Sequence, residues 1–422
     1  MNGRWVVCAA VGVLCGYLSG YVIGHTRTNY AVVVHDGRAS LFGSGPAAAA
    51  VVAALIAVAV VLVLGRFRAR YLVAVAAGLA GLATVVAIAA MQSAGTWSQD
   101  WVLGSIGAGL LAAVAVSRPE GQVWFVAGSV IAVLYGARID ASAAVMRRYA
   151  DYAPSGTVPD LPESWPLLVA AVIALLAAGF VIGRERIEPV TDHRAVVVGA
   201  AIPMVVGALI LVVGRLPGKP SVTVAVLAVV AAVAASWWLP RADGAFTLTM
   251  LAVAAVIAVD PSVAFGPDRV GVSIQVGVLL LGALVATVAR SAGMPATGTW
   301  GPVAGIGLLA LVASTGLAPA SATLTEAAYR FVLPAVIGSA VGSCLPVAPT
   351  TVLGLSVFPV VALLVENSRV GTEFGWTAYL PDTYEIARNP TAATIAATVV
   401  ITGCAALMLL LRRVSPVRTS VG

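Results

Sequence analysis

The sequence predicts an all-α polytopic membrane protein, a bundle of about 14 transmembrane helices, roughly 12 to 14, with both termini in the cytoplasm. Three observations lead to this fold class. Hydrophobic residues make up 60% of the 422 residues and charged residues only 10%, with a mean hydropathy of +1.01, which soluble domains do not reach. Apolar runs of about 20 residues, the length that crosses a bilayer, recur along the chain. Arginines cluster in the short connections between them.

The individual spans are bounded by charged residues or prolines. In chain order they are expected at 5–24, 46–65, 71–91, 102–116, 122–137, 166–183, 195–214, 221–239, 245–264, 270–289, 300–318, 330–348, 350–366 and 391–411. The first run is longer than a signal-peptide core, so we expect it to be retained as a helix. A charged loop then separates an N-terminal bundle of about six helices, 1–194, from a C-terminal bundle of about eight, 195–422.

Arginine placement predicts the orientation of the bundle. If every run crosses the membrane, the arginine clusters at 66–70, 184–194 and 412–418 fall on the same side as Arg4, and the positive-inside rule makes that side cytoplasmic. Alanine, valine, glycine and arginine are encoded by GC-rich codons, and arginine supplies all of the basic residues except Lys219. We therefore expect a bacterial protein of the inner membrane. Its expected partners are the lipid bilayer and other envelope membrane proteins, and not nucleic acid, because no basic stripe with interleaved aromatic residues occurs.

Three connections on the outer side have recognisable features. Residues 30–42 place Asp36-Gly37, a pair that favours a tight turn, between two short apolar runs, which predicts a β-hairpin. The segments 137–165 and 366–390 are long outer loops. Within the first span, Gly16, Gly20 and Gly24 share one face and predict close packing of a neighbouring helix.

The segment 331–351 is the candidate functional centre, because Pro334, Pro346 and Pro349 interrupt an apolar run. Broken helices at membrane depth often form the substrate sites of secondary transporters. The expected substrate-binding residues are Asp260, Gln275, Pro334, Gly338, Ser339, Gly342, Ser343 and Thr350. The alternative is that the glycines and serines of this segment form a small-residue face for helix packing, and that Asp260 lies in an interfacial turn.

Several kinds of chemistry are excluded by the motifs that are missing. The three histidines lie at span ends or in loops, and neither a His-Glu-x-x-His nor a Cys-x-x-Cys pattern occurs, so we expect no metal site and no cofactor. Lys219 is followed by proline and lacks the glycine spacing of a phosphate-binding loop. ATP-driven transport by this chain alone is therefore excluded, and so is a conventional hydrolase.

Three functions remain compatible with the sequence. The favoured one is a secondary permease or flippase for an apolar or lipid-linked substrate. The alternatives are a non-catalytic subunit of a cell-envelope or secretion complex, and a membrane glycosyltransferase that uses a polyprenyl-phosphate donor with Asp36 as its base. The span count resembles that of major facilitator proteins, but their cytoplasmic Gly-x-x-x-Asp-Arg-x-Gly-Arg loop has no match at Arg66 to Arg70 or elsewhere, so no family is assigned.

Overall fold

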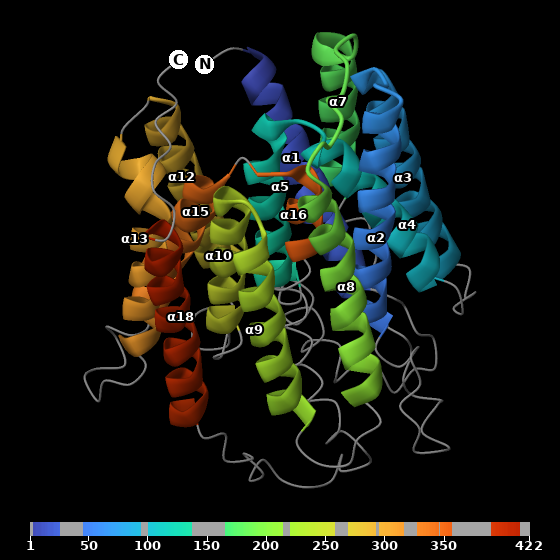
Figure 1. The fold of residues 1–422 in the computed structure, drawn as a ribbon. Coiled ribbons are helices and arrows are strands. Elements are labelled where there is room, and N and C mark those ends of the chain that lie inside the picture. Colours follow the sequence, from blue (N-terminus) through green and yellow to red (C-terminus); the bar gives the residue numbers. More distant parts are fainter. Residues whose placement is uncertain are drawn as a thin grey trace, which may run out of the picture.

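The computed structural model describes residues 3–25, 45–93, 100–136, 165–213, 220–257, 269–292, 295–315, 327–345, 347–356 and 390–413, and most of them are helical. Figure 1 shows the helices as one bundle. They are α1 (Gly3–His25), α2 (Gly45–Arg66), α3 (Tyr71–Ser93), α4 (Asp100–Val116), α5 (Pro119–Ile131), η3 (Ala132–Gly136), α7 (Trp165–Ile182), α8 (His193–Val213), α9 (Pro220–Trp238), α10 (Arg241–Ile257), α12 (Arg269–Ser291), α13 (Pro295–Thr315), η5 (Ala328–Val332), α15 (Leu333–Cys344), α16 (Pro349–Leu355) and α18 (Pro390–Arg413).

The predicted spans overlap these helices, and the described part of the expected run 350–366 is helical at 350–355. Each expected run overlaps one α-helix, with the π-helical turns η3 and η5 extending α5 and α15. Within the residues that the structure describes, five segments are long and apolar enough to cross a membrane by length and composition, and shorter apolar helices accompany them. The five are Gly3–Ile23, Ala49–Arg66, Tyr71–Ile88, Gly271–Ser291 and Thr394–Leu411. The polytopic helical bundle predicted from the sequence is therefore confirmed.

The outer surface of the bundle carries large apolar side chains. Phe180 is 94% exposed, and Leu311 and Val399 are each 63% exposed. Water would solvate such side chains poorly, whereas lipid tails solvate them well. The arrangement fits a bundle whose lateral solvent is the hydrocarbon of a bilayer.

Glycines allow the backbones of α1 and α5 to approach closely. A Cβ atom added to Gly12 would lie 2.6 Å from the carbonyl oxygen of Gly121, and one added to Gly20 would lie 2.7 Å from the Cβ of Ala132. Gly16 is closer still to the backbone of Phe125. The close packing predicted for Gly16 and Gly20 is therefore confirmed.

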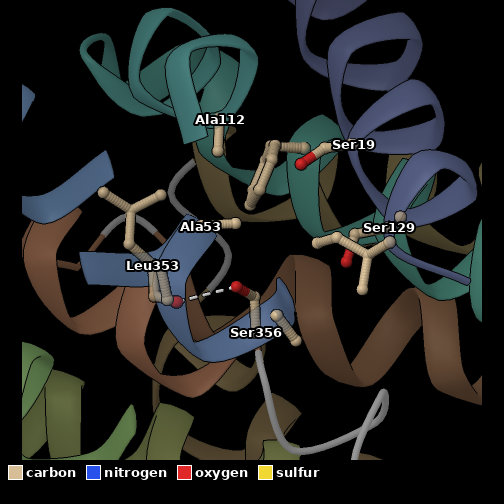
Figure 2. A pocket seen from close by; sticks show the side chains of 11 residues that line it. Ser19, Ala53, Ala112, Ser129, Leu353 and Ser356 are labelled. Atoms are coloured by element: carbon tan, nitrogen blue, oxygen red, sulfur yellow. Dashed lines mark hydrogen bonds between the residues drawn. The ribbon is translucent and has the colours of Figure 1, made fainter. Parts of the chain in front are cut away.

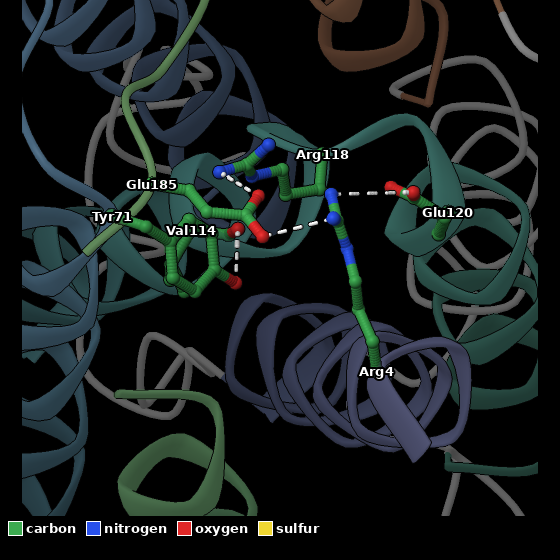
Figure 3. A network of polar contacts seen from close by, with 6 residues as sticks. All are labelled: Arg4, Tyr71, Val114, Arg118, Glu120 and Glu185. Atoms are coloured by element: carbon green, nitrogen blue, oxygen red, sulfur yellow. Dashed lines mark hydrogen bonds and ion pairs between the residues drawn. The ribbon is translucent and has the colours of Figure 1, made fainter. Parts of the chain in front are cut away.

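Charged connections meet at one end of the bundle. The backbone N–H of Tyr71 donates to the carbonyl of Glu185 at 2.8 Å, which joins the α2–α3 turn to the segment after α7. Glu185 also pairs with Arg4 and with Arg118, each at 2.8 Å, and Arg4 lies 3.8 Å from Glu120 (Figure 3). The clusters at 66–70 and 184–186 thus lie at the same end as Arg4, as predicted, while the assignment of that end to the cytoplasm stays a prediction.

Some predicted features lie outside the residues that the structure describes. These are Asp260, the predicted hairpin 30–42 that contains Asp36, and the outer loops 137–165 and 366–390. Only the last residue of each loop is described, where α7 and α18 begin. The division at residue 194 into two bundles also stays a prediction.

The centre of the bundle is occupied by α15 and α16, with other helices around them (Figure 1). The first of them packs against α10, α12 and α13, whereas α16 packs mainly against α8 and α2. The chain therefore passes from one group of helices to another between Leu345 and Ala348.

Candidate functional site: a broken helix at the centre of the bundle

The break between α15 and α16 follows from two prolines. Leu345 and Ala348 each precede a proline in the sequence, and proline forces the residue before it into an extended conformation. Leu345 accordingly has φ −87° and ψ 151°, and Ala348 has φ −59° and ψ 133°. A helix cannot continue through such residues. We refer to residues 343–349 as the α15–α16 junction.

Arg290 of α12 holds the carbonyl side of this junction. Its Nη1 donates to the carbonyl oxygen of Ser343 at 3.2 Å and also to that of Leu345. These carbonyls end α15, where the helix itself supplies no donor. A cation at this position also interacts favourably with the negative end of the helix dipole.

Two buried side chains hold the N–H side of the junction. The Oδ1 of Asp243, in the first turn of α10, accepts from the N–H of Ala348 at 2.9 Å, and the Oε1 of Gln122, in α5, accepts from the N–H of Val347 at 3.1 Å. Asp243 is 5% exposed and Gln122 is 2% exposed. Backbone groups released by a helix break are costly in a membrane unless they find partners. Here the partners come from α5, α10 and α12.

A small cavity lies at the other end of α16. Its volume is about 30 Å³, enough for a water molecule. The hydroxyls of Ser19, Ser129 and Ser356 surround it, together with apolar side chains that include Leu353 (Figure 2). Ser19 donates to the carbonyl of Ala108 at 2.9 Å, and Ser356 donates to that of Leu353 at 2.8 Å. The short helix α16 therefore lies between a polar junction and a serine-lined cavity.

Gly338 and Gly342, both predicted to bind substrate, lie in the contact between α15 and α12. A Cβ atom on Gly342 would lie 2.8 Å from the carbonyl oxygen of Ala283, and one on Gly338 would lie 2.9 Å from the backbone nitrogen of the same residue. Ser339 and Ser343 donate to carbonyls of their own helix at 3.0 and 2.8 Å. This geometry agrees with the packing alternative.

The remaining predicted residues divide between two places. Gln275 is buried on α12, and Pro334 is buried in the first turn of α15. Thr350 is buried in the first turn of α16, where its carbonyl group faces Gly199 of α8. Ser343 is thus the first residue of the junction and Thr350 directly follows it, whereas Gln275 and Pro334 lie further along α12 and α15. A role of these residues in substrate binding stays a prediction.

Sequence patterns did not indicate the three side chains that hold the junction, which are Gln122, Asp243 and Arg290. Gln122 is the first residue of an expected span, whereas Asp243 and Arg290 lie within two residues of one and were grouped with the loops. The expected span order places all three borders, and the break, on one side of the membrane. That shared side was the signal that could have suggested a common site.

Comparison with known proteins shows a general similarity to solved structures of membrane transporters. No protein family matches the chain, and no curated protein is similar to it. Among solved structures, it is similar to the MFS proton:xylose symporter XylE bound to 6-bromo-6-deoxy-D-glucose, with 13% identity, a TM-score of 0.45, and coverage of 98% of this chain and 95% of that one. It is also similar to an auto-inhibited POT family peptide transporter, with 13% identity, a TM-score of 0.47 and 98% of both chains covered. These low scores assign neither family nor substrate.

Proposed function

We propose that this polytopic protein is a permease or flippase for an apolar or lipid-linked substrate, acting in a bacterial inner membrane. The observation that supports the proposal best is the α15–α16 junction. Irregular backbone inside a membrane protein persists where protein buries it or where it lines a path, and transporters use such breaks for binding and movement. In this chain the break lies at the centre of the bundle, held by side chains from three other helices.

The junction is well placed to move. It links α15, which packs against α10, α12 and α13, to α16, which packs against α8 and α2. Helices are stiff, so along this stretch of the chain a displacement between the two groups would be absorbed by the residues between Leu345 and Ala348. Their hydrogen bonds go to single side chains, which can rotate to new partners more easily than a helical ladder can shift.

Buried charge in the bundle is scarce, which favours a substrate that is apolar or carries its charge outside the hydrocarbon. Among the residues whose side chains the structure describes, Asp243 is the one acidic side chain that is buried, and it bonds the N–H of Ala348. Coupling to a small ion usually requires several intramembrane carboxylates. During flipping of a lipid-linked substrate the hydrocarbon chain stays in lipid, so only the polar group has to cross along the protein.

A flipping assay tests the proposal. The purified chain is reconstituted in liposomes with either a fluorescent polyprenyl phosphate or a fluorescent phospholipid, and dithionite reports how much probe reaches the outer leaflet. We expect protein-dependent movement of at least one probe, slowed by Asp243→Ala and unchanged by Asp192→Ala, which removes a carboxylate at the start of α8. Rates equal to those of protein-free liposomes for both probes would refute the proposal.

The two alternative functions would be examined next if the flipping assay fails. A non-catalytic subunit would show no flipping of either probe and would co-purify with a defined envelope protein. A glycosyltransferase would transfer sugar from a polyprenyl-phosphate donor and lose that activity on Asp36→Ala.

A further inference from the structure

An apolar groove runs along the outside of the bundle between α8 and α9, which lie side by side in Figure 1. Its volume is about 360 Å³. The lining includes Val197, Ala201 and Val205 of α8, Ala231 and Ala234 of α9, and Trp238, which is the last residue of α9.

The shape of the groove follows from helical spacing and small side chains. Positions 197, 201 and 205 are four apart, so they form one stripe along α8. Residues 231, 234 and 235 are alanines, whose small side chains leave space between α9 and α8. Eight residues of helix cover about 12 Å, which is close to the roughly 15 Å depth of one leaflet. The groove therefore has the length and the polarity of a site for one lipid acyl chain.

Cationic and aromatic residues gather at one end of this groove. Arg194 precedes Val197 by three residues, so it lies on the same face of α8 one turn away. Arg241 begins α10 three residues after Trp238, which ends α9, and both arginines are exposed. Trp237 and Trp238 are 61% and 48% exposed, as expected for aromatic residues at the membrane interface.

The carboxylate just before α8 caps that helix. Oδ1 of Asp192 accepts a hydrogen bond from the backbone N–H of Arg194 at 2.9 Å, which caps the start of the helix. The Arg194 guanidinium is not part of that bond. The groove therefore combines an apolar channel, an aromatic belt and two guanidinium groups, in the order in which a lipid presents its tail, its interface and its headgroup.

We propose that this groove binds an anionic phospholipid, with one acyl chain between α8 and α9 and the phosphate at Arg194 and Arg241. Guanidinium groups bind phosphate oxygens bidentately, and basic pockets between transmembrane helices bind anionic headgroups. The site depends on the groove and on its two arginines, so it does not depend on the transport function proposed above.

Native mass spectrometry of the purified full chain in detergent tests this site. The chain is titrated with phosphatidylglycerol or with phosphatidylcholine, and the Kd of the first bound lipid is measured. We expect phosphatidylglycerol to bind more tightly. Arg194→Gln and Arg241→Gln should each raise its Kd about fivefold while hardly changing the Kd of phosphatidylcholine. Ala234→Phe, which fills the groove, should weaken binding of both lipids.

The matched control changes the same charge at another place on the same end. Arg66→Gln and Arg68→Gln affect two exposed arginines, at the last residue of α2 and just after it, and should leave both Kd values unchanged. Equal Kd values for the two lipids in the unaltered chain would overturn the proposal. A loss of phosphatidylglycerol binding in the control variants as large as in the groove variants would also overturn it, and so would unchanged binding after Ala234→Phe.

Discussion

Replacing Gly342 by alanine tests whether the glycines of α15 serve helix packing. The added Cβ would lie 2.8 Å from the carbonyl oxygen of Ala283, 3.0 Å from the Cβ of Ala286 and 3.3 Å from the Cα of Ala283. Two of these atoms belong to the backbone of α12 and cannot rotate away. Reaching an ordinary contact of 3.4 Å requires the helices to separate by about 0.6 Å, the difference between 3.4 and 2.8 Å. Overpacking of this kind costs about 1 to 3 kcal/mol.

The assay compares unfolding in detergent for Gly342→Ala and for a control on the facing helix. Gly277 lies in α12 and would meet nothing within 4 Å if it carried a Cβ, so Gly277→Ala should be neutral or stabilising by up to about 1 kcal/mol. We expect a lower unfolding midpoint for Gly342→Ala alone. Equal midpoints for the two variants would refute the close packing of α12 against α15.

Three further predictions concern polar contacts. Asp243→Ala leaves the buried N–H of Ala348 without its acceptor and should lower the free energy of unfolding by about 1 to 3 kcal/mol. Asp243→Asn keeps an acceptor oxygen, so in the same unfolding measurement it should retain most of the stability that Asp243→Ala loses. Arg290→Ala should lower the free energy of unfolding by about 1.5 to 3 kcal/mol, because two carbonyls lose a charged donor. Adding a salt that contains no guanidinium to the unaltered chain should not lower its free energy of unfolding by that amount. Glu185→Gln should cost less than about 1 kcal/mol, since its ion pairs are partly exposed, and the difference from the unaltered chain should shrink as ionic strength rises; a loss above 3 kcal/mol would contradict this interpretation.

The helices could be predicted from the sequence because lipid imposes a simple requirement. Every crossing needs about 20 apolar residues, and charges or prolines mark where each crossing ends. The α15–α16 break could also be located, because Pro346 and Pro349 restrict the residues before them. These are local signals, and a single sequence contains them.

The side chains that hold the break could not be predicted, because their partners are remote in the chain. Gln122 lies 225 residues before Val347, Asp243 lies 105 residues before Ala348, and Arg290 lies 55 residues before Leu345. Helical periodicity and composition carry no information on which helices become neighbours. Only the three-dimensional arrangement brings α5, α10 and α12 to the same four residues.

The two interpretations of Gly338 and Gly342 could not be separated from the sequence for a different reason. A small-residue face suits close helix packing and an open path equally well. The distances to Ala283 distinguish them, because a Cβ on either glycine would come within 3 Å of the α12 backbone. Any path for a substrate would therefore run along another side of α15.

Thiol labelling of Cys344 tests most directly whether the α15–α16 junction moves. This cysteine ends α15, is 3% exposed, and shares a hydrogen bond of 3.0 Å with the hydroxyl of Thr249. A variant that keeps Cys344 as its single cysteine is treated with a membrane-impermeant reagent from each side. The control variant keeps only Cys15, a fully buried residue of α1. If the junction opens during transport, Cys344 is labelled from one side and faster than Cys15. Equal protection of both cysteines from both sides would contradict a moving junction and leave the break a fixed structural element.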